Sequence, residues 1–304
     1  MAKLALLFPG QGSQFVGMGK DLVEASPAAR DVFEEADAAL GFALSRLCFE
    51  GPEEELQRTA NTQPAILSHS IAAWRDLQAR FPERIEGAAF AAGHSLGEYS
   101  AEVATGALSF ADAVRLVRQR GLFMQEAVPA GVGAMAAIVG LSPEVVEAAC
   151  EESARGEVVS PANFNSPEQT VIAGHAGAVA RACAACTARG AKRTIPLPVS
   201  APFHCSLMAP ARERLRPLLD ETRFADSAIP VVTNVDALPR SRGDHLRDAL
   251  LAQVDAPVRW VESVRLLARE GVDRAIEIGP GKVLSGLVRR IERGIEMESY
   301  GGTG

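Results

Sequence analysis

One serine lies between two glycines, in the segment Gly93-His94-Ser95-Leu96-Gly97. The apolar residues 88–92 before it are expected to form a strand, and residues 98–104 after it have the composition of a helix. A serine on such a tight turn can act as a nucleophile, because glycines permit strained backbone and the helix N-terminus favours developing negative charge. Ser95 is therefore the candidate nucleophile, although a pattern this short also occurs by chance.

A serine nucleophile needs a base, and the sequence contains five histidines. His204 follows Pro202 and Phe203 in a turn where the chain leaves a predicted small unit, so its side chain could face a cleft. His94 is a poorer candidate, because neighbouring side chains in a tight turn diverge. A turn histidine can equally be satisfied by the backbone, and the sequence leaves both interpretations of His204 open.

Arg120 differs from the neighbouring charged residues by its place on a predicted helix over residues 111–124. At about 100° per residue it falls in the apolar arc, whereas Arg115 and Arg118 fall on the opposite side. An isolated charge on a buried face is costly, so the guanidinium must meet an acceptor. That acceptor is either an internal Asp or Glu, or a substrate carboxylate held by the planar guanidinium fork.

Strands and helices alternate in the segments that carry these residues, which indicates an α/β fold. A glycine-rich loop at residues 9–14 follows the first strand. The expected strands outside the small unit are 4–8, 88–92, 230–233 and 275–278, and the expected helices include 28–40 and 62–81.

Residues 133–199 have a pattern of their own, with strand, helix, two strands, helix and strand in succession. This βαββαβ order is typical of a ferredoxin-like unit. The strands are expected at 135–139, 158–163, 170–173 and 193–196, with one helix beginning at 142 and another at 176–189. We therefore expect a large α/β subdomain from residues 1–131 and 199–304, a ferredoxin-like small subdomain at 132–198, and a frayed tail from Tyr300 onward.

Charge and composition exclude several classes of protein. A formal net charge of −7 argues against a nucleic-acid-binding protein, which usually carries a basic face. The sequence shows no secretion signal, its five cysteines form no disulfide framework, and its apolar runs are too short to span a membrane. We expect a cytoplasmic, soluble enzyme with neither nucleic acid nor membrane as a partner.

Three short motifs suggest cofactor sites, and none is complete. Cys183 and Cys186 have metal-binding spacing but lack a second pair, so core packing is the simpler interpretation. The loop at residues 10–15 lacks the third glycine of a dinucleotide fingerprint, and in 279–283 Val283 stands where a P-loop needs Ser or Thr. The sequence therefore predicts no metal and no nucleotide cofactor.

Taken together, the motifs resemble those of malonyl-CoA:acyl-carrier-protein transacylases, in the same order and over nearly the whole chain. The resemblance implies an α/β-hydrolase-like body with a short, mainly parallel sheet and the inserted ferredoxin-like unit. It also implies an acyltransferase of lipid metabolism, of the type that serves bacterial fatty-acid biosynthesis. The motifs are residues 10–14, 93–98, the Arg120 helix followed by 133–135, 163–167, 202–204 and 279–281.

The resemblance also implies a role for each residue of the reaction. Ser95 would attack the thioester of malonyl-CoA after His204 removes its proton, and the phosphopantetheine thiol of acyl carrier protein would then attack the malonyl-serine ester, in a ping-pong cycle. The main-chain carbonyl of Gln253 would orient His204. Backbone N–H groups of Gln11 and Leu96 would form the oxyanion hole.

Further residues would determine which acyl group is bound. By the same resemblance Arg120 would bind the malonyl carboxylate, and Phe203 would crowd an α-methyl group. Asn163 and Gln63 match positions near the pocket, although buried amides that brace loops would look the same. Because CoA and acyl carrier protein are anionic, the basic residues at 289–293 and 192–193 are candidate docking patches, or else solvated surface.

Two other functions remain open from the sequence. A serine hydrolase would share the serine and the histidine and would release its acyl group rapidly to water. A module that binds carrier protein without catalysis would keep the fold and form no acyl-enzyme. The inward position of Arg120 argues against a lipase, whose acyl pocket should be uncharged.

Overall fold

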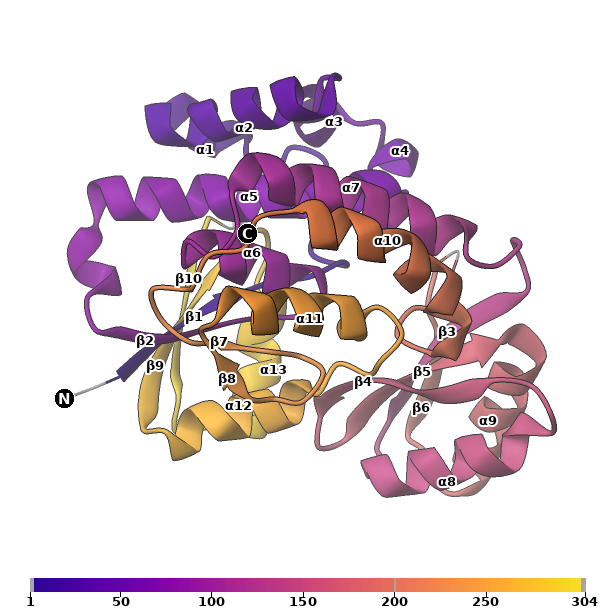
Figure 1. Cartoon of the computed structure of the whole chain (residues 1–304). Coiled ribbons are helices and arrows are strands. Elements are labelled where there is room, and N and C mark those ends of the chain that lie inside the picture. The colour runs from indigo at the N-terminus through magenta and orange to yellow at the C-terminus, as the bar shows by residue number, and fades with distance from the viewer. Residues whose placement is uncertain (1–2, 200, 302–304) are drawn as a thin grey trace.

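A mainly parallel six-stranded sheet forms the centre of the larger part of the molecule (Figure 1). The computed structural model describes residues 3–199 and 201–301. The strand order is β10-β9-β1-β2-β7-β8, and only β8 runs antiparallel to its neighbour. The strands are β1 (Lys3–Phe8), β2 (Ala88–Gly93), β7 (Val231–Val232), β8 (Pro239–Arg240), β9 (Val272–Ile278) and β10 (Glu296–Tyr300).

Helices cover both faces of this sheet. Successive side chains of a strand point to opposite faces, and those of β1 are apolar on both, so each face needs a covering layer. Leu4, Leu6 and Phe8 of β1 belong to an apolar cluster with residues of α5 (Thr59–Arg80), α6 (Leu96–Ala104) and α11 (Gly243–Gln253). Ala5 and Leu7 belong to a second cluster with α12 (Trp260–Arg269) and α13 (Val283–Ile291). The result is a three-layer α/β body, so the α/β class and the mainly parallel sheet predicted from the sequence are confirmed.

A third apolar cluster packs α5 against helices farther from the sheet. Serine caps define where two of these helices begin: the Ser26 hydroxyl accepts from Ala29 N at 3.3 Å, and the Ser109 hydroxyl accepts from Asp112 N at 3.1 Å. The helices are α2 (Pro27–Leu40), α7 (Phe110–Glu126) and α10 (Ala209–Glu221), with the shorter α1 (Lys20–Ala25), α3 (Leu44–Glu50) and α4 (Glu53–Gln57), and the 3-10 turns η1 (Pro82–Ile85) and η2 (Ser206–Met208).

The small unit is an antiparallel sheet in the order β4-β5-β3-β6. One face, with Ala136, Ile138 and Ile172, packs on its two helices, and the other face, with Met135 and Ala137, joins the cluster around α5 and α7. The elements are β3 (Gly133–Val139), α8 (Pro143–Ala154), β4 (Val159–Ser166), β5 (Gln169–His175), α9 (Ala176–Ala188) and β6 (Arg193–Pro196). They occur in the expected order, with small shifts at their ends.

The end of the described chain differs from the expectation. The prediction of a frayed tail from Tyr300 onward is wrong at Tyr300, which ends β10 and extends the sheet parallel to β9. Its hydroxyl donates to Asp76 Oδ2 at 2.5 Å, and its ring packs edge-on against Phe81. Residues 302–304 lie outside the described residues.

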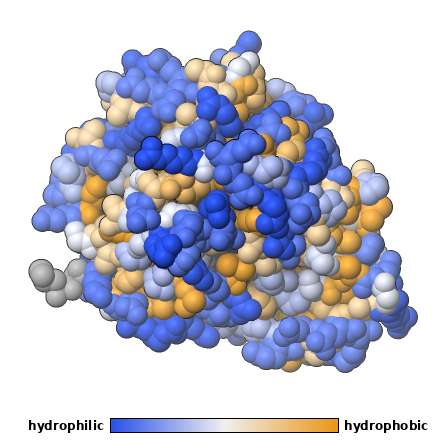
Figure 2. All heavy atoms as spheres, in the orientation of Figure 1, coloured by the Kyte–Doolittle hydropathy of each residue, from blue (hydrophilic) through white to orange (hydrophobic). Residues whose placement is uncertain are grey.

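Within the described parts of the chain, no helix has both the length and the apolar character needed to cross a bilayer. Figure 2 shows a face on which hydrophilic and hydrophobic residues are interspersed.

Candidate active site

Ser95 lies on a strained turn between β2 and α6. Its backbone has φ 51° and ψ −107°, a positive φ that residues other than glycine rarely adopt. The flanking glycines are required by close approach: a Cβ on Gly93 would lie 1.9 Å from the Gly97 carbonyl carbon, and a Cβ on Gly97 would lie 2.0 Å from Phe8 O. The close approach of Gly93 to the far side of the turn, and of Gly97 to β1, therefore explains the two glycines around the serine.

The Ser95 hydroxyl faces His204, although 109 positions separate the two residues. Ser95 Oγ lies 2.7 Å from His204 Nε2, and His204 Nδ1 lies 3.0 Å from the main-chain oxygen of Gln253. Because a carbonyl oxygen only accepts, Nδ1 carries the proton and Nε2 is the acceptor for the serine hydroxyl. Burial, and secondarily the charge of Arg120, lower the pKa of His204 to about 3, so the imidazole is neutral at neutral pH.

Arg120 is buried on α7 and is held by neutral side chains. Its Nη1 donates to Gln63 Oε1 at 2.8 Å, and its Nη2 donates to Gln253 Oε1 at 2.8 Å and to Ser95 Oγ at 3.2 Å. The guanidinium lies 5.7 Å from the centre of the Tyr99 ring. No acidic side chain of the described residues forms an ion pair with Arg120, so no direct partner neutralises the guanidinium, which lies 3.2 Å from the serine hydroxyl. Burial lowers the pKa of Arg120 from its usual value.

These residues line one small cavity of about 110 Å³, bordered by the body and by β3, β4 and the segment after β6. Gln253 does not line the cavity but contacts it through His204, whose Nδ1 donates to the Gln253 main-chain oxygen. Leu96 is buried and is the first residue of α6, so its N–H has no acceptor within its own helix. The lining residues are Gln11, Gln63, His94, Ser95, Arg120, Met124, Met135, Asn163, Leu197, Val199, Phe203 and His204.

His94 borders the cavity together with Ser95. Its Nε2 lies 2.8 Å from Asn165 Oδ1, and its ring centre lies 5.6 Å from that of Trp260. His94 thus connects the serine turn to β4 and has no hydrogen bond to Ser95 among the described residues.

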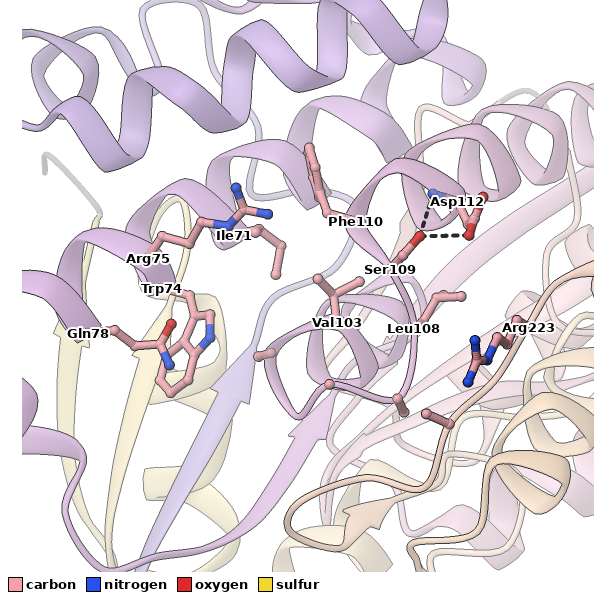
Figure 3. A pocket seen from close by; sticks show the side chains of 14 residues that line it. Ile71, Trp74, Arg75, Gln78, Val103, Leu108, Ser109, Phe110, Asp112 and Arg223 are labelled. Carbon is pink, nitrogen blue, oxygen red and sulfur yellow. Dashed lines mark hydrogen bonds between the residues drawn. The ribbon is translucent and has the colours of Figure 1, made fainter.

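A larger hollow of about 530 Å³ lies elsewhere, against α5 and the start of α7 (Figure 3). Trp74, Phe110 and Arg223 line it, and the Ser109 hydroxyl there donates to Asp112 Oδ2 at 2.6 Å. None of the site residues expected from the sequence borders this hollow. The chemistry of the lining, rather than the size of the cavity, identifies the candidate site.

Sequence reasoning missed two residues that hold the serine turn. Asn234 Oδ1 accepts from Ser95 N at 2.7 Å, and Asn234 Nδ2 donates to Gly93 O at 2.7 Å. The main-chain N–H of Asn234 donates to Glu98 Oε2 at 2.9 Å. The carboxyl ends of neighbouring parallel strands meet at one edge of a sheet, so the position just after β7 was a usable signal. It was a faint one, because β7 has only two residues.

Residue types that bind metals are spread over the described part of the chain. Within residues 3–199 and 201–301, no three His, Cys, Asp or Glu side chains lie together in an arrangement that could hold a metal ion. The cysteines of the chain are free, and Cys186 belongs to the apolar cluster of the small unit.

Comparison with known proteins places the chain among acyltransferases. Residues 5–300 match the acyl transferase domain. The malonyl CoA-acyl carrier protein transacylase of Escherichia coli K12 is 54% identical over 291 residues, covering 96% of this chain and 93% of the relative. The enzyme of the same description from Bacillus subtilis 168 is 51% identical over 294 residues, with coverages of 96% and 92%.

Solved structures agree with these matches. An acyl carrier protein S-malonyltransferase from Vibrio cholerae has a TM-score of 0.94 at 49% identity, covering 98% of this chain and 96% of that one. The malonyl-transacylase PlMCAT, in complex with the type II PKS acyl-carrier protein AntF, has a TM-score of 0.96 at 48% identity, with coverages of 99% and 97%.

Proposed function

Because this chain belongs to the malonyl-CoA:acyl-carrier-protein transacylases of the acyl transferase domain family, enzymes of fatty-acid biosynthesis, we propose that it works by a ping-pong mechanism through a malonyl ester of Ser95. The malonyl group would pass from CoA to Ser95 and then to the phosphopantetheine thiol of acyl carrier protein. The observation that carries this proposal is the hydrogen-bonded chain from Ser95 through His204 to the Gln253 carbonyl, with Arg120 beside it.

In the first half of the cycle, His204 Nε2 accepts the proton of Ser95 Oγ as that oxygen attacks the thioester carbonyl. The C–S bond then breaks, and the CoA sulfur leaves with the proton from His204. In the second half, His204 removes the proton of the carrier thiol, the thiol attacks the ester, and the proton returns to Ser95 Oγ. General-base assistance of this kind typically contributes about 10²- to 10⁴-fold.

Negative charge develops on the carbonyl oxygen during both attacks. We assign its stabilisation to the backbone N–H groups of Gln11 and Leu96, because Gln11 borders the cavity and Leu96 begins the helix that follows Ser95. No metal ion or organic cofactor has a part in this mechanism, since base, nucleophile and anion donors all come from the chain.

Arg120 binds the malonyl carboxylate in this proposal. Three observations support the assignment: the side chain is buried, it is held by amides that leave its charge intact, and its Nη2 lies 3.2 Å from the oxygen that would carry the acyl group. A bound carboxylate would also offset the influence of Arg120 on His204, which would raise the pKa of the base when the correct substrate is present.

The other residues of the cavity have supporting roles. Gln63 holds one side of the Arg120 guanidinium. Phe203 borders the cavity next to His204 and would crowd an α-methyl group, so methylmalonyl is a poorer substrate than malonyl in this proposal. Asn163 borders the cavity from β4, where it is available to the pantetheine amides.

The names for the two subdomains are also proposals. The serine turn between β2 and α6, on a mainly parallel sheet, supports an α/β-hydrolase-like body. The βαββαβ order and the antiparallel sheet support a ferredoxin-like unit at 132–198. Location in the cytoplasm stays a prediction of the sequence.

The test is the intact mass of the protein after mixing with malonyl-CoA. We expect one malonyl adduct on the wild-type protein and none on Ser95→Ala. Addition of phosphopantetheinylated carrier protein should discharge the adduct much faster than water does. Discharge by water at the same rate would indicate a hydrolase, and the absence of any adduct would indicate a binding module without catalysis.

A further inference from the structure

Gln253, the last residue of α11, contacts all three principal residues of the site. Its main-chain oxygen accepts from His204 Nδ1, and its side-chain Oε1 accepts from Arg120 Nη2 at 2.8 Å. Its Nε2 donates to Ser95 O at 3.1 Å and to Glu98 Oε2 at 2.8 Å. A single side-chain amide therefore lies between the guanidinium and a buried carboxyl group.

The two ends of this amide are not interchangeable. A guanidinium only donates hydrogen bonds, so Arg120 requires the amide oxygen. Burial raises the pKa of Glu98 to about 7, but its Oε2 accepts the fixed main-chain N–H of Asn234 and therefore presents an acceptor that requires the amide NH₂. If the amide turned over, NH₂ would face the guanidinium and oxygen would face the carboxylate. Glu98 and Arg120 together therefore select one orientation of Gln253.

Glu98 is itself held in place. It is fully buried on α6, and its Oε2 also accepts from the main-chain N–H of Asn234 at 2.9 Å. The carboxyl group does not touch Arg120 directly, because Gln253 lies between them. This spacing keeps an acidic anchor close to the guanidinium without forming an ion pair that would neutralise it.

We propose that Glu98 is a positioning residue for substrate selection, which acts through the Gln253 side chain to hold the Arg120 guanidinium beside the Ser95 hydroxyl. By this means Glu98 contributes to the preference for acyl donors that carry a free carboxylate. The inference rests on the function proposed above, in which Arg120 binds that carboxylate.

The test compares Glu98→Leu with the wild-type protein in a competition assay. Malonyl-CoA and acetyl-CoA are supplied together, and the acyl-carrier products are separated by mass, so that their ratio gives the ratio of the two kcat/KM values. Leucine at position 98 offers no acceptor, so the Gln253 NH₂ loses its partner there and position 98 no longer selects one orientation of the amide. We expect the malonyl-to-acetyl ratio to fall about tenfold, as for the loss of one member of a coupled network.

Glu102→Leu is the matched control. Glu102 lies one turn later on α6 and is equally buried, but neither of its carboxyl oxygens has a hydrogen-bond partner among the described residues. Its substitution should leave the ratio within about twofold of the wild-type value, because no network member is removed. A general effect of losing a buried acid from α6 would change both variants alike and would overturn the proposal.

A second substitution keeps the proposal testable if Glu98→Leu fails to fold. In Glu98→Gln the amide oxygen can replace Glu98 Oε2 and accept from both Asn234 N–H and Gln253 Nε2, so the malonyl-to-acetyl ratio should stay within about twofold of the wild-type value. A fall of about tenfold in Glu98→Gln, or a wild-type ratio in folded Glu98→Leu, would refute the inference.

The mass assay on wild-type protein separates this failure from a failure of the proposed function. No malonyl adduct on Ser95 would end both. A normal adduct, together with an unchanged ratio in Glu98→Leu, would end only the role of Glu98.

Discussion

Arg120→Gln removes the buried charge and keeps a polar side chain. In the proposed mechanism the malonyl carboxylate lies near the guanidinium, whose Nη2 is 3.2 Å from Ser95 Oγ. Two unit charges about 4 Å apart attract by about 4 kcal/mol at an effective dielectric constant of 20. Part of this is offset by desolvation of the carboxylate, so we expect a net loss of about 2–3 kcal/mol, close to that for hydrogen bonds to charged groups.

This loss corresponds to a decrease of about 30- to 150-fold in kcat/KM for malonyl transfer. Acetyl transfer should fall much less, because an acetyl group has no carboxylate to bind. Loss of the Arg120 charge also removes one cause of the low pKa of His204, so the base should become stronger. The measurement is the initial rate of transfer to carrier protein with each CoA ester separately, as a function of its concentration.

Folding of the variant must be checked by thermal unfolding, because Gln63 and Gln253 lose the donor that they share. Leaving buried acceptors unpaired costs about 1–3 kcal/mol of stability. If the folded variant loses malonyl and acetyl transfer by the same factor, Arg120 does not bind the carboxylate, and the assignment of substrate class from its position is refuted.

Two further predictions concern the turn at Ser95 and the buried side chain of His69. Gly97→Ala should lower the free energy of unfolding in urea by about 3 kcal/mol or more, because the added Cβ would lie 2.0 Å from Phe8 O. Gly286→Ala is the control: nothing lies within 4 Å of its added Cβ, so it should stabilise α13 by up to about 1 kcal/mol. Equal effects of the two substitutions would contradict the close approach at Gly97. Burial lowers the pKa of His69 from 6.5 to about 4, so between these values the unfolded chain binds more protons and stability is lost as the pH falls. His69→Gln should lack this loss. As the pH is lowered from 6.5 to 4, the free energy of unfolding of His69→Gln should therefore rise by about 3 kcal/mol relative to that of the wild type, measured by denaturation at each pH. An equal pH dependence of the two proteins would show that His69 does not titrate in this range.

Several features could be predicted because they depend on local periodicity. The turn at Ser95 is visible in the sequence as two glycines between a strand and a helix, and the structure shows close contacts at both. The buried position of Arg120 follows from the 3.6-residue period of α7. The alternation of elements in the small unit follows from the change between strand and helix patterns.

Other features depend on which segments pack together, and the sequence left them open. Whether Arg120 meets an internal acid or a neutral partner could not be decided from α7 alone, because Gln63 comes from α5 and Gln253 from α11. The contacts of Glu98 and Asn234 were missed for the same reason, since 136 positions separate them along the chain. The tail was misjudged because Tyr300 is anchored by Asp76, which lies on α5.

The sequence by itself thus determined the kinds of secondary-structure element, the glycine-flanked turn at Ser95 and the buried position of Arg120, each of which is encoded in a few consecutive residues. Only the tertiary structure brought Ser95 and His204 within 2.7 Å and put the Gln253 side chain between Arg120 and Glu98. The physical reason is that local periodicity reports the conformation of one segment, whereas contacts between distant segments depend on how strands and helices pack around the core.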